Sequence, residues 1–212
     1  KGVETVRMGK ADIGTLHRHL SAEEQAAGIV ETRLDSLAYS VIVNKLNPVN
    51  ELSLDQVLKI FAGQIGNWKE VGGKDRNIMI YRQECGANYD DLIEQAIKKA
   101  GIAKNQDRLK QAVMSVAVTE NQLEKIADLE MAITMAPRFF SDDKSKALRI
   151  GGILPSRASE KDGSYPLVAN VSLVSRPASS EAAQKYLAFI KSPHGRELIE
   201  KGFAMDWVRQ GF

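Results

Sequence analysis

Apolar runs of strand length alternate with helical patterns along the chain, and this alternation constrains the fold more than any other feature. Residues 37–43 form a largely apolar run, and residues 78–81 form a second one rich in β-formers. Between them Ser53 begins a helical pattern, and Gln56 completes the spacing of a capping box. Because such alternation is typical of sheets covered by helices, the sequence predicts an α/β fold. Residues 155–164 form the longest polar stretch and are expected to be a loop.

The composition excludes several classes of function. The 29 basic and 27 acidic residues leave a net charge of only +2, which is too weak to recruit nucleic acid. The apolar runs are too short to span a bilayer. Cys85 is the only cysteine, so the chain forms neither an internal disulfide nor a multi-cysteine metal site. We therefore expect a soluble globular protein with no nucleic-acid partner.

The turn from Arg82 to Asn88 has the composition of an anion site. It joins the strand at 78–81 to a helix for which Asn88 is a suitable N-cap. A helix N-terminus presents unpaired N–H groups and about half a positive charge, and Gly86 allows the backbone to direct these groups at a ligand. Arg82 adds a planar guanidinium that suits a phosphate or carboxylate. The same residues also fit an ordinary capped turn with a surface arginine.

Asp12 lies in a stretch bounded by Gly9 and Gly14. An ionised carboxylate only accepts hydrogen bonds, so it suits an anionic ligand only if that ligand still carries a proton. In that role Asp12 would accept the O–H of the ligand and disfavour a fully deprotonated anion. The alternative is an aspartate that satisfies the backbone of its own turn.

No group of residues predicts catalysis or a metal site. His17 and His19 share a face only on a strand, and no nearby Cys, Asp or Glu has the spacing of a zinc site. Cys85 has the chemistry of a nucleophile, but no histidine lies near it in the sequence, and a small packed residue is the simpler interpretation. We therefore expect a protein that is not an enzyme and needs no cofactor or metal.

Four stretches carry more information through their order than any of them carries alone. They are Gly9-Lys10-Ala11-Asp12-Ile13-Gly14 with Arg18 and Leu20; Val41-Ile42-Val43-Asn44 with Asn47-Pro48-Val49; Leu52-Ser53-Leu54 with Ile60-Phe61-Ala62-Gly63 and Asn67-Trp68-Lys69-Glu70-Val71-Gly72-Gly73; and Tyr165-Pro166-Leu167 with Ser192-Pro193 and Gly202-Phe203. The third is the most specific. Together they resemble the phosphate-type substrate-binding proteins of bacterial ABC transporters.

This resemblance implies a two-lobed periplasmic-binding-protein fold of type 2. Lobe 1 would comprise residues 1–43 and 169–212, and lobe 2 residues 44–168. The lobes would close by a hinge around phosphate or a related small oxyanion, and the loaded protein would dock to an ABC transporter permease in the periplasm or elsewhere outside the cytoplasm. Asp12 and Arg82 match the ligand-facing aspartate and arginine of the family. The turn that completes the site would be Cys85, Gly86, Ala87 and Asn88.

The chain departs from the family pattern in two places. The family usually has Ser-Gly-Thr where this chain has Cys85-Gly86-Ala87, so two hydroxyl donors are lost. Because a hydrogen bond to a charged group contributes roughly 1.5–3 kcal/mol, we expect binding about two to four orders of magnitude weaker. The family also has a strand, a helix and a second strand before the helix at which this sequence begins, so this part of lobe 1 is expected to be missing. Self-association through the incomplete lobe would cover the exposed sheet edge.

Two other hypotheses remain open. The lost hydroxyls favour a binding-protein fold used as a sensor or interaction module, with an altered or lost ligand. An enzyme with Cys85 as nucleophile is the third possibility. A response of the folded chain to phosphate would favour the binding protein, and a reactive thiol at Cys85 would favour the enzyme.

Overall fold

The computed structural model describes residues 2–83, 88–116, 119–140 and 143–204, which form two compact units. Unit 1 contains the residues up to Leu37 and those from Ala169 through the last helix, and unit 2 contains Ala38–Val168. The sequence predicts the first passage between lobes after Val43. The two compact units divide between Leu37 and Ala38, inside strand β2 (Val30–Asn44), which continues without a break through both units. The lobe boundary after Val43 stays a prediction.

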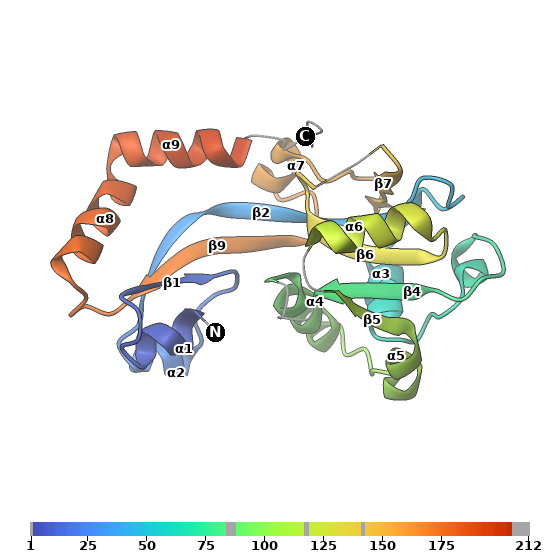
Figure 1. Ribbon diagram of the computed structural model, residues 1–212, viewed down its shortest axis with the longest axis horizontal. Coiled ribbons are helices and arrows are strands. Elements are labelled where there is room, and N and C mark those ends of the chain that lie inside the picture. The colour runs from blue at the N-terminus through green and yellow to red at the C-terminus, as the bar shows by residue number, and fades with distance from the viewer. Residues whose placement is uncertain (1, 84–87, 117–118, 141–142, 205–212) are drawn as a thin grey trace. The chain divides into compact units, whose positions relative to one another are not determined.

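Unit 1 is built on a sheet in which β9 (Val168–Ser175) lies between β1 (Ile13–Leu16) and the first part of β2. β1 and β9 are antiparallel, with Ile13 opposite Ser175 and Leu16 opposite Ser172. The helices of the unit are α1 (Gly2–Arg7), α2 (Ala22–Ala26), α8 (Glu181–Lys191) and α9 (Pro193–Ala204), shown in Figure 1.

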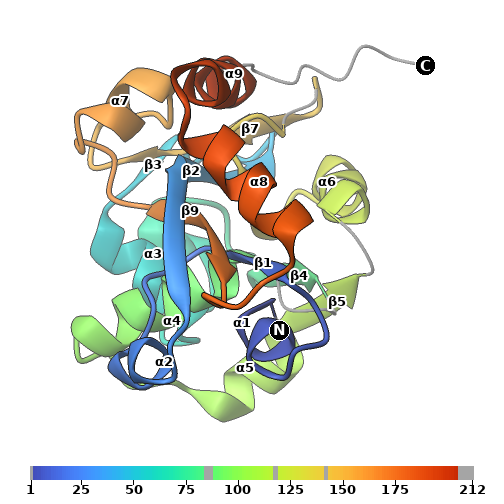
Figure 2. The ribbon, with the colours of Figure 1, turned by 90° about the vertical axis from the view of Figure 1, so that its left-hand side faces the viewer.

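Both faces of this sheet are packed, because successive residues of a strand point to opposite sides. On β9, Val174 joins the core formed with α1 and its neighbours, whereas Leu173 packs against Leu187 and Ile190 of α8. Figure 2 shows α8 beside β9 and β2. α1 approaches β1 so closely that a Cβ on Gly14 would lie 2.6 Å from the carbonyl oxygen of Gly2, so this contact requires glycine.

Unit 2 is built on the second part of β2, followed in the sheet by β6 (Ala132–Pro137), β4 (Met79–Gln83) and β5 (Val113–Val116). β2 and β6 are antiparallel, and β4 is parallel to both β5 and β6. β7 (Ser145–Ala147) pairs with β2, and the short strands β3 (Glu51–Leu52) and β8 (Arg149–Ile150) pair with each other. The helices are α3 (Leu54–Phe61), η1 (Trp68–Val71), α4 (Asn88–Lys99), α5 (Gln106–Ala112), α6 (Thr119–Asp128) and α7 (Arg157–Lys161).

The α/β prediction is confirmed, and local signals explain the best-predicted elements. α3 begins with the expected capping box: the Ser53 hydroxyl accepts the Gln56 N–H at 3.1 Å, and Oε1 of Gln56 accepts the Ser53 N–H at 2.8 Å. The loop expected at 155–164 is wrong in part, because this stretch contains α7, which also starts with a capping box, between Ser156 and Ser159. None of the helices in the described ranges is long and apolar enough to cross a membrane.

Candidate functional site

Asp12 precedes β1 in unit 1, and its carboxylate holds the N-terminus of α8. One carboxylate oxygen accepts the Ser180 N–H at 3.0 Å, and the other accepts the Ser180 hydroxyl at 2.9 Å. Ser180 is itself the N-cap of α8, because its hydroxyl oxygen accepts the N–H of Ala183 at 3.3 Å. Asp12 therefore links the start of β1 to a helix whose N-cap lies 168 residues later.

The electrostatic surroundings keep Asp12 ionised. The hydrogen bonds from the backbone and the side chain of Ser180 lower the pKa of the Asp12 carboxyl, and the charge of Arg176 lowers it further. Gly9 makes room for that arginine, since a Cβ at Gly9 would lie 3.2 Å from a guanidinium nitrogen of Arg176. Each carboxylate oxygen has about two lone pairs, so the bonds from Ser180 leave acceptor capacity on both oxygens.

The residues from His17 to His19 do not form a shared site. The imidazole of His17 is partly buried, and burial lowers its pKa. Arg18 donates from both terminal nitrogens to Glu24 at 2.7 Å, and these bonds lower the Glu24 pKa to about 2. His19 contacts the side-chain amide of Asn170 at 2.6 Å. Among the described residues no group of three or more His, Cys, Asp or Glu side chains is arranged to hold a metal ion.

Arg82 lies near the carboxyl end of β4 in unit 2, opposite Ser115 of the parallel strand β5. Its guanidinium lies over the ring of Phe61, 5.8 Å from the ring centroid, and Nη2 is 3.4 Å from the Phe61 carbonyl oxygen. Phe61 is the last residue of α3 and is fully buried. The carboxyl ends of parallel strands are the usual location of ligand sites in open α/β sheets, so the topology places Arg82 at a favourable edge.

The backbone immediately before Arg82 is held by two buried polar side chains. The carbonyl oxygen of Tyr81 accepts Oγ1–H of Thr134 at 2.8 Å and Nε2–H of Gln122 at 3.1 Å. Thr134 lies on β6 and Gln122 on α6, and both are 0% exposed. These bonds fix the end of β4 to its neighbours in the unit and so restrict where the Arg82 side chain can point.

The turn after Arg82 is described only at its ends. Cys85, Gly86 and Ala87 lie outside the described residues, so their predicted roles stay predictions. α4 begins at Asn88 itself, one position before the start that an N-cap at Asn88 would give. The strand β4 and the helix α4 lie on either side of this segment, in the order expected from the sequence.

The structure places the predicted residues in both units, with Asp12 in unit 1 and Arg82 and Asn88 in unit 2. It also adds partners that sequence reasoning missed. Ser180 was recognisable as a helix cap, but nothing local connects it to Asp12. Phe61 was recognisable as the end of an amphipathic helix, but nothing in its spacing indicates a contact with Arg82.

Comparison with known proteins gives the same family along nearly the whole chain. The PBP superfamily domain matches residues 1–194. The phosphate-binding protein PstS of Bacillus subtilis is 29% identical over 215 residues, which cover 97% of this chain and 66% of that protein. PstS of Borreliella burgdorferi is 21% identical, over 87% of this chain and 68% of that protein. This chain thus spans about two thirds of the length of these relatives.

Solved structures show the same fold. A structure described as a phosphate ABC transporter substrate-binding protein from Clostridium perfringens, with bound phosphate, superposes with a TM-score of 0.80 at 25% identity, over 94% of this chain and 81% of that one. An ABC-type phosphate transport receptor from Vibrio cholerae superposes with a TM-score of 0.78 at 22% identity, with the same coverage. The two-lobed fold class expected from the sequence is therefore confirmed.

Proposed function

The chain belongs to the PBP superfamily, and we propose that it binds phosphate or a related small oxyanion for an ABC transporter. The observation that carries the proposal is the position of Arg82, whose guanidinium is held over Phe61 near the carboxyl end of β4, the strand that precedes α4. The similarity to phosphate-binding proteins along 97% of the chain supports it. The role would be capture and delivery, without bond making or breaking.

Arg82 would supply the main charge of the site. Its guanidinium can donate two parallel hydrogen bonds to two oxygens of one oxyanion. The N-terminal N–H groups of α4 would add neutral donors, together with the backbone of Cys85, Gly86, Ala87 and Asn88. Because Cys85 and Ala87 have no hydroxyl groups, backbone N–H groups would carry most of this part of the binding.

Asp12 would select the protonation state of the ligand. Its lowered pKa keeps the carboxylate ionised near neutral pH, so it acts only as an acceptor. A phosphate that retains a proton can donate to it, whereas sulfate has no proton to donate. Asp12 would then serve two purposes, since the same carboxylate also holds Ser180 at the start of α8.

Thermal unfolding in the presence of phosphate, sulfate, molybdate and tungstate tests the proposal. A ligand at one hundred times its dissociation constant stabilises the folded state by about 2.7 kcal/mol, which raises the midpoint of a chain of this size by roughly 5–11 °C. We expect this shift with phosphate and its loss in Arg82→Ala. Arg149→Ala is the matched control, because Arg149 is an exposed arginine of the same unit whose side chain donates to the Gly152 carbonyl oxygen.

The result also decides between the open hypotheses. A shift with one anion that survives in Arg149→Ala and is absent in Arg82→Ala identifies the ligand and supports an oxyanion-binding protein with Arg82 in its site. If none of the four anions shifts the midpoint of the natural protein, a sensor or interaction module becomes the better proposal. An equal shift in the natural protein and in Arg82→Ala would remove Arg82 from the site.

A further inference from the structure

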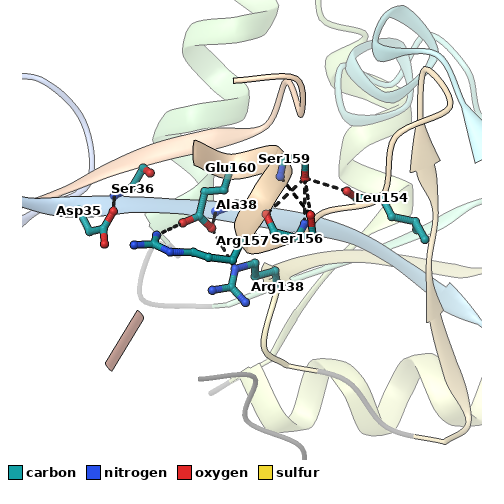
Figure 3. A network of polar contacts seen from close by, with 9 residues as sticks. All are labelled: Asp35, Ser36, Ala38, Arg138, Leu154, Ser156, Arg157, Ser159 and Glu160. Carbon is teal, nitrogen blue, oxygen red and sulfur yellow. Dashed lines mark hydrogen bonds and ion pairs between the residues drawn. The ribbon is translucent and has the colours of Figure 1, made fainter. Parts of the chain in front are cut away.

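A fully buried carboxylate lies beside the point where β2 enters unit 2. Glu160 of α7 accepts three N–H groups, from the backbone of Ala38 at 2.8 Å, from Nε of Arg138 at 3.0 Å and from Nη1 of Arg157 (Figure 3). The Glu160 side chain is 0% exposed, and those of Arg138 and Arg157 are 2% and 18% exposed. All four residues belong to unit 2.

Ala38 needs this carboxylate because its regular strand partner ends. β2 and β6 pair from Val43 opposite Ile133 to Tyr39 opposite Pro137. One step further the N–H of Arg138 still donates to the Ala38 carbonyl oxygen at 2.9 Å, but Arg138 already lies in the turn that follows β6. The Ala38 N–H therefore cannot continue the ladder, and Oε2 of Glu160 accepts it instead.

The chain crosses between the units a second time at residues 168–169, and the segment just before this crossing is bonded to Tyr39 of β2. The N–H of Tyr39 donates to the Leu167 carbonyl oxygen at 2.8 Å, and the Tyr165 hydroxyl donates to the Tyr39 carbonyl oxygen at 3.0 Å. Leu167 immediately precedes β9, the strand that leads back into unit 1. Both passages are thus fixed to the body of unit 2 at residues 38–39 of β2.

The hydrogen bonds and ion pairs of Glu160 are unusual for a contact whose only role is to stabilise the folded state. Removing a carboxylate and a guanidinium from water is costly, and apolar side chains of similar size often stabilise a core as well or better. A buried ion pair does, however, favour one arrangement of its donors over all others. A carboxylate with three directed hydrogen bonds therefore fixes the positions of its donors, whereas an apolar contact would allow the same groups to slide past one another.

We infer that Glu160 is a positioning residue that fixes, on unit 2, the point from which β2 continues into unit 1. In the described part of the chain the two units are joined at residues 37–38 and 168–169, so a hinge motion between them would bend the chain at these residues. Because Ala38 is fixed to unit 2, the bending of β2 is limited to the few residues that precede Ala38, on the side of unit 1. The effect on ligand affinity rests on the proposed function, whereas the effect on the strand does not.

Glu160→Gln tests this inference, with Glu130→Gln as the matched control. The amide keeps the size of Glu160 but removes its charge, and Glu130 is a carboxylate of the same unit that pairs with Lys74 on the surface. We expect amide hydrogen exchange at Ala38 to accelerate by about tenfold or more, and small-angle scattering of the ligand-free protein to show a broader distribution of dimensions. We also expect the phosphate Kd to rise by about tenfold with the order of anions unchanged.

A purely structural role gives a different result. The urea midpoint would then fall, but Ala38 would exchange only as fast as global unfolding allows, and the scattering profile and the Kd would match those of Glu130→Gln. That outcome overturns the inference. If Glu160→Gln does not fold, Arg157→Met removes only the more exposed arginine and should produce the same changes to a smaller extent. Normal exchange at Ala38 in folded Arg157→Met would likewise overturn it.

The proposed function and the inference about Glu160 can be disproved independently of each other. If the natural protein binds none of the anions, but Glu160→Gln alters the exchange of Ala38 and the scattering profile, Glu160 positions the strand and the proposed function is wrong. If phosphate binds and Glu160→Gln changes none of the three measurements, the proposed function stands and the inference about Glu160 is wrong.

Discussion

The guanidinium of Arg82 lies 5.8 Å from the centroid of the Phe61 ring, so the candidate anion-binding arginine rests on the last residue of α3. The same residue offers its carbonyl oxygen to Nη2 at 3.4 Å. A long side chain that is held in this way loses less conformational entropy on binding a ligand than a mobile one. The buried Phe61 therefore holds the arginine on which the proposed function depends.

Phe61→Leu should weaken phosphate binding while the protein stays folded. Leucine fills much of the buried space but has no aromatic face for the guanidinium. A cation–π contact contributes about 0.5–1 kcal/mol, so the Kd measured by calorimetry should rise roughly two- to fivefold. Ile60→Val is the control, because Ile60 is equally buried on the same helix. An unchanged Kd in folded Phe61→Leu would show that the ring does not orient Arg82.

Asp12→Asn should reduce the preference for phosphate over sulfate. The amide can still accept the Ser180 N–H, but it is neutral and offers donors where the carboxylate offered only acceptors. A hydrogen bond to a charged group contributes roughly 1.5–3 kcal/mol, so the ratio of the two dissociation constants should change by about one to two orders of magnitude. Calorimetric titration with each anion measures this ratio.

Ser180→Ala separates the two purposes of Asp12. It removes the N-cap of α8 and one donor to Asp12, which should lower the free energy of unfolding by about 1 kcal/mol. Asp12 keeps its charge in this variant, so the anion preference should remain. If Ser180→Ala changes the preference as much as Asp12→Asn does, Asp12 acts only through the position of α8.

Local signals in the sequence explain why part of this architecture was predictable. The capping box at Ser53 and Gln56 fixed the start of α3, and the apolar run at 37–43 marked the second half of β2. The first half of β2 has no apolar run to mark it, because charged residues such as Glu31, Arg33 and Asp35 interrupt its apolar pattern. Its strand conformation depends on pairing within unit 1, and tertiary pairing overrides a weak local pattern.

The contacts at the candidate sites depend on residues far apart in the chain. Asp12 and Ser180 are separated by 168 residues, and Ala38 and Glu160 by 122. The stretch around Glu160 is polar in sequence, and polar stretches are usually exposed loops. Its burial becomes understandable only once β6 is seen to end at Pro137 and to leave the Ala38 N–H without a strand partner.

Glu24 should stabilise unit 1 at neutral pH but not in acid. Its bonds from Arg18 lower its folded-state pKa from an ordinary value of 4.5 to about 2. A carboxyl with a depressed folded-state pKa contributes stability above its unfolded-state pKa and loses it as the pH falls through the folded-state pKa. Glu24→Gln should therefore cost on the order of 1 kcal/mol at pH 7, after allowance for solvent screening, and progressively less between pH 4.5 and pH 2.

Urea unfolding of both proteins at a series of pH values measures this difference. Glu23→Gln is the control, since Glu23 lies beside Glu24 on α2 and is exposed. A constant difference between the natural protein and Glu24→Gln from pH 7 to pH 3 would show that the charge of Glu24 is not what stabilises the pair.

Restoring hydroxyls to the turn after Arg82 should strengthen phosphate binding. In Cys85→Ser and Ala87→Thr each new hydroxyl can donate to the anion that Arg82 is proposed to bind. Since a hydrogen bond to a charged group contributes roughly 1.5–3 kcal/mol, each substitution should lower the phosphate Kd about tenfold or more.

Cys85→Ala separates the gain of the hydroxyl from the loss of the thiol. The same substitutions in an Arg82→Ala background should gain little, because the hydroxyls need the charge that brings the anion to the turn. A gain that is equally large without Arg82 would mean that the anion binds at the turn independently of the arginine.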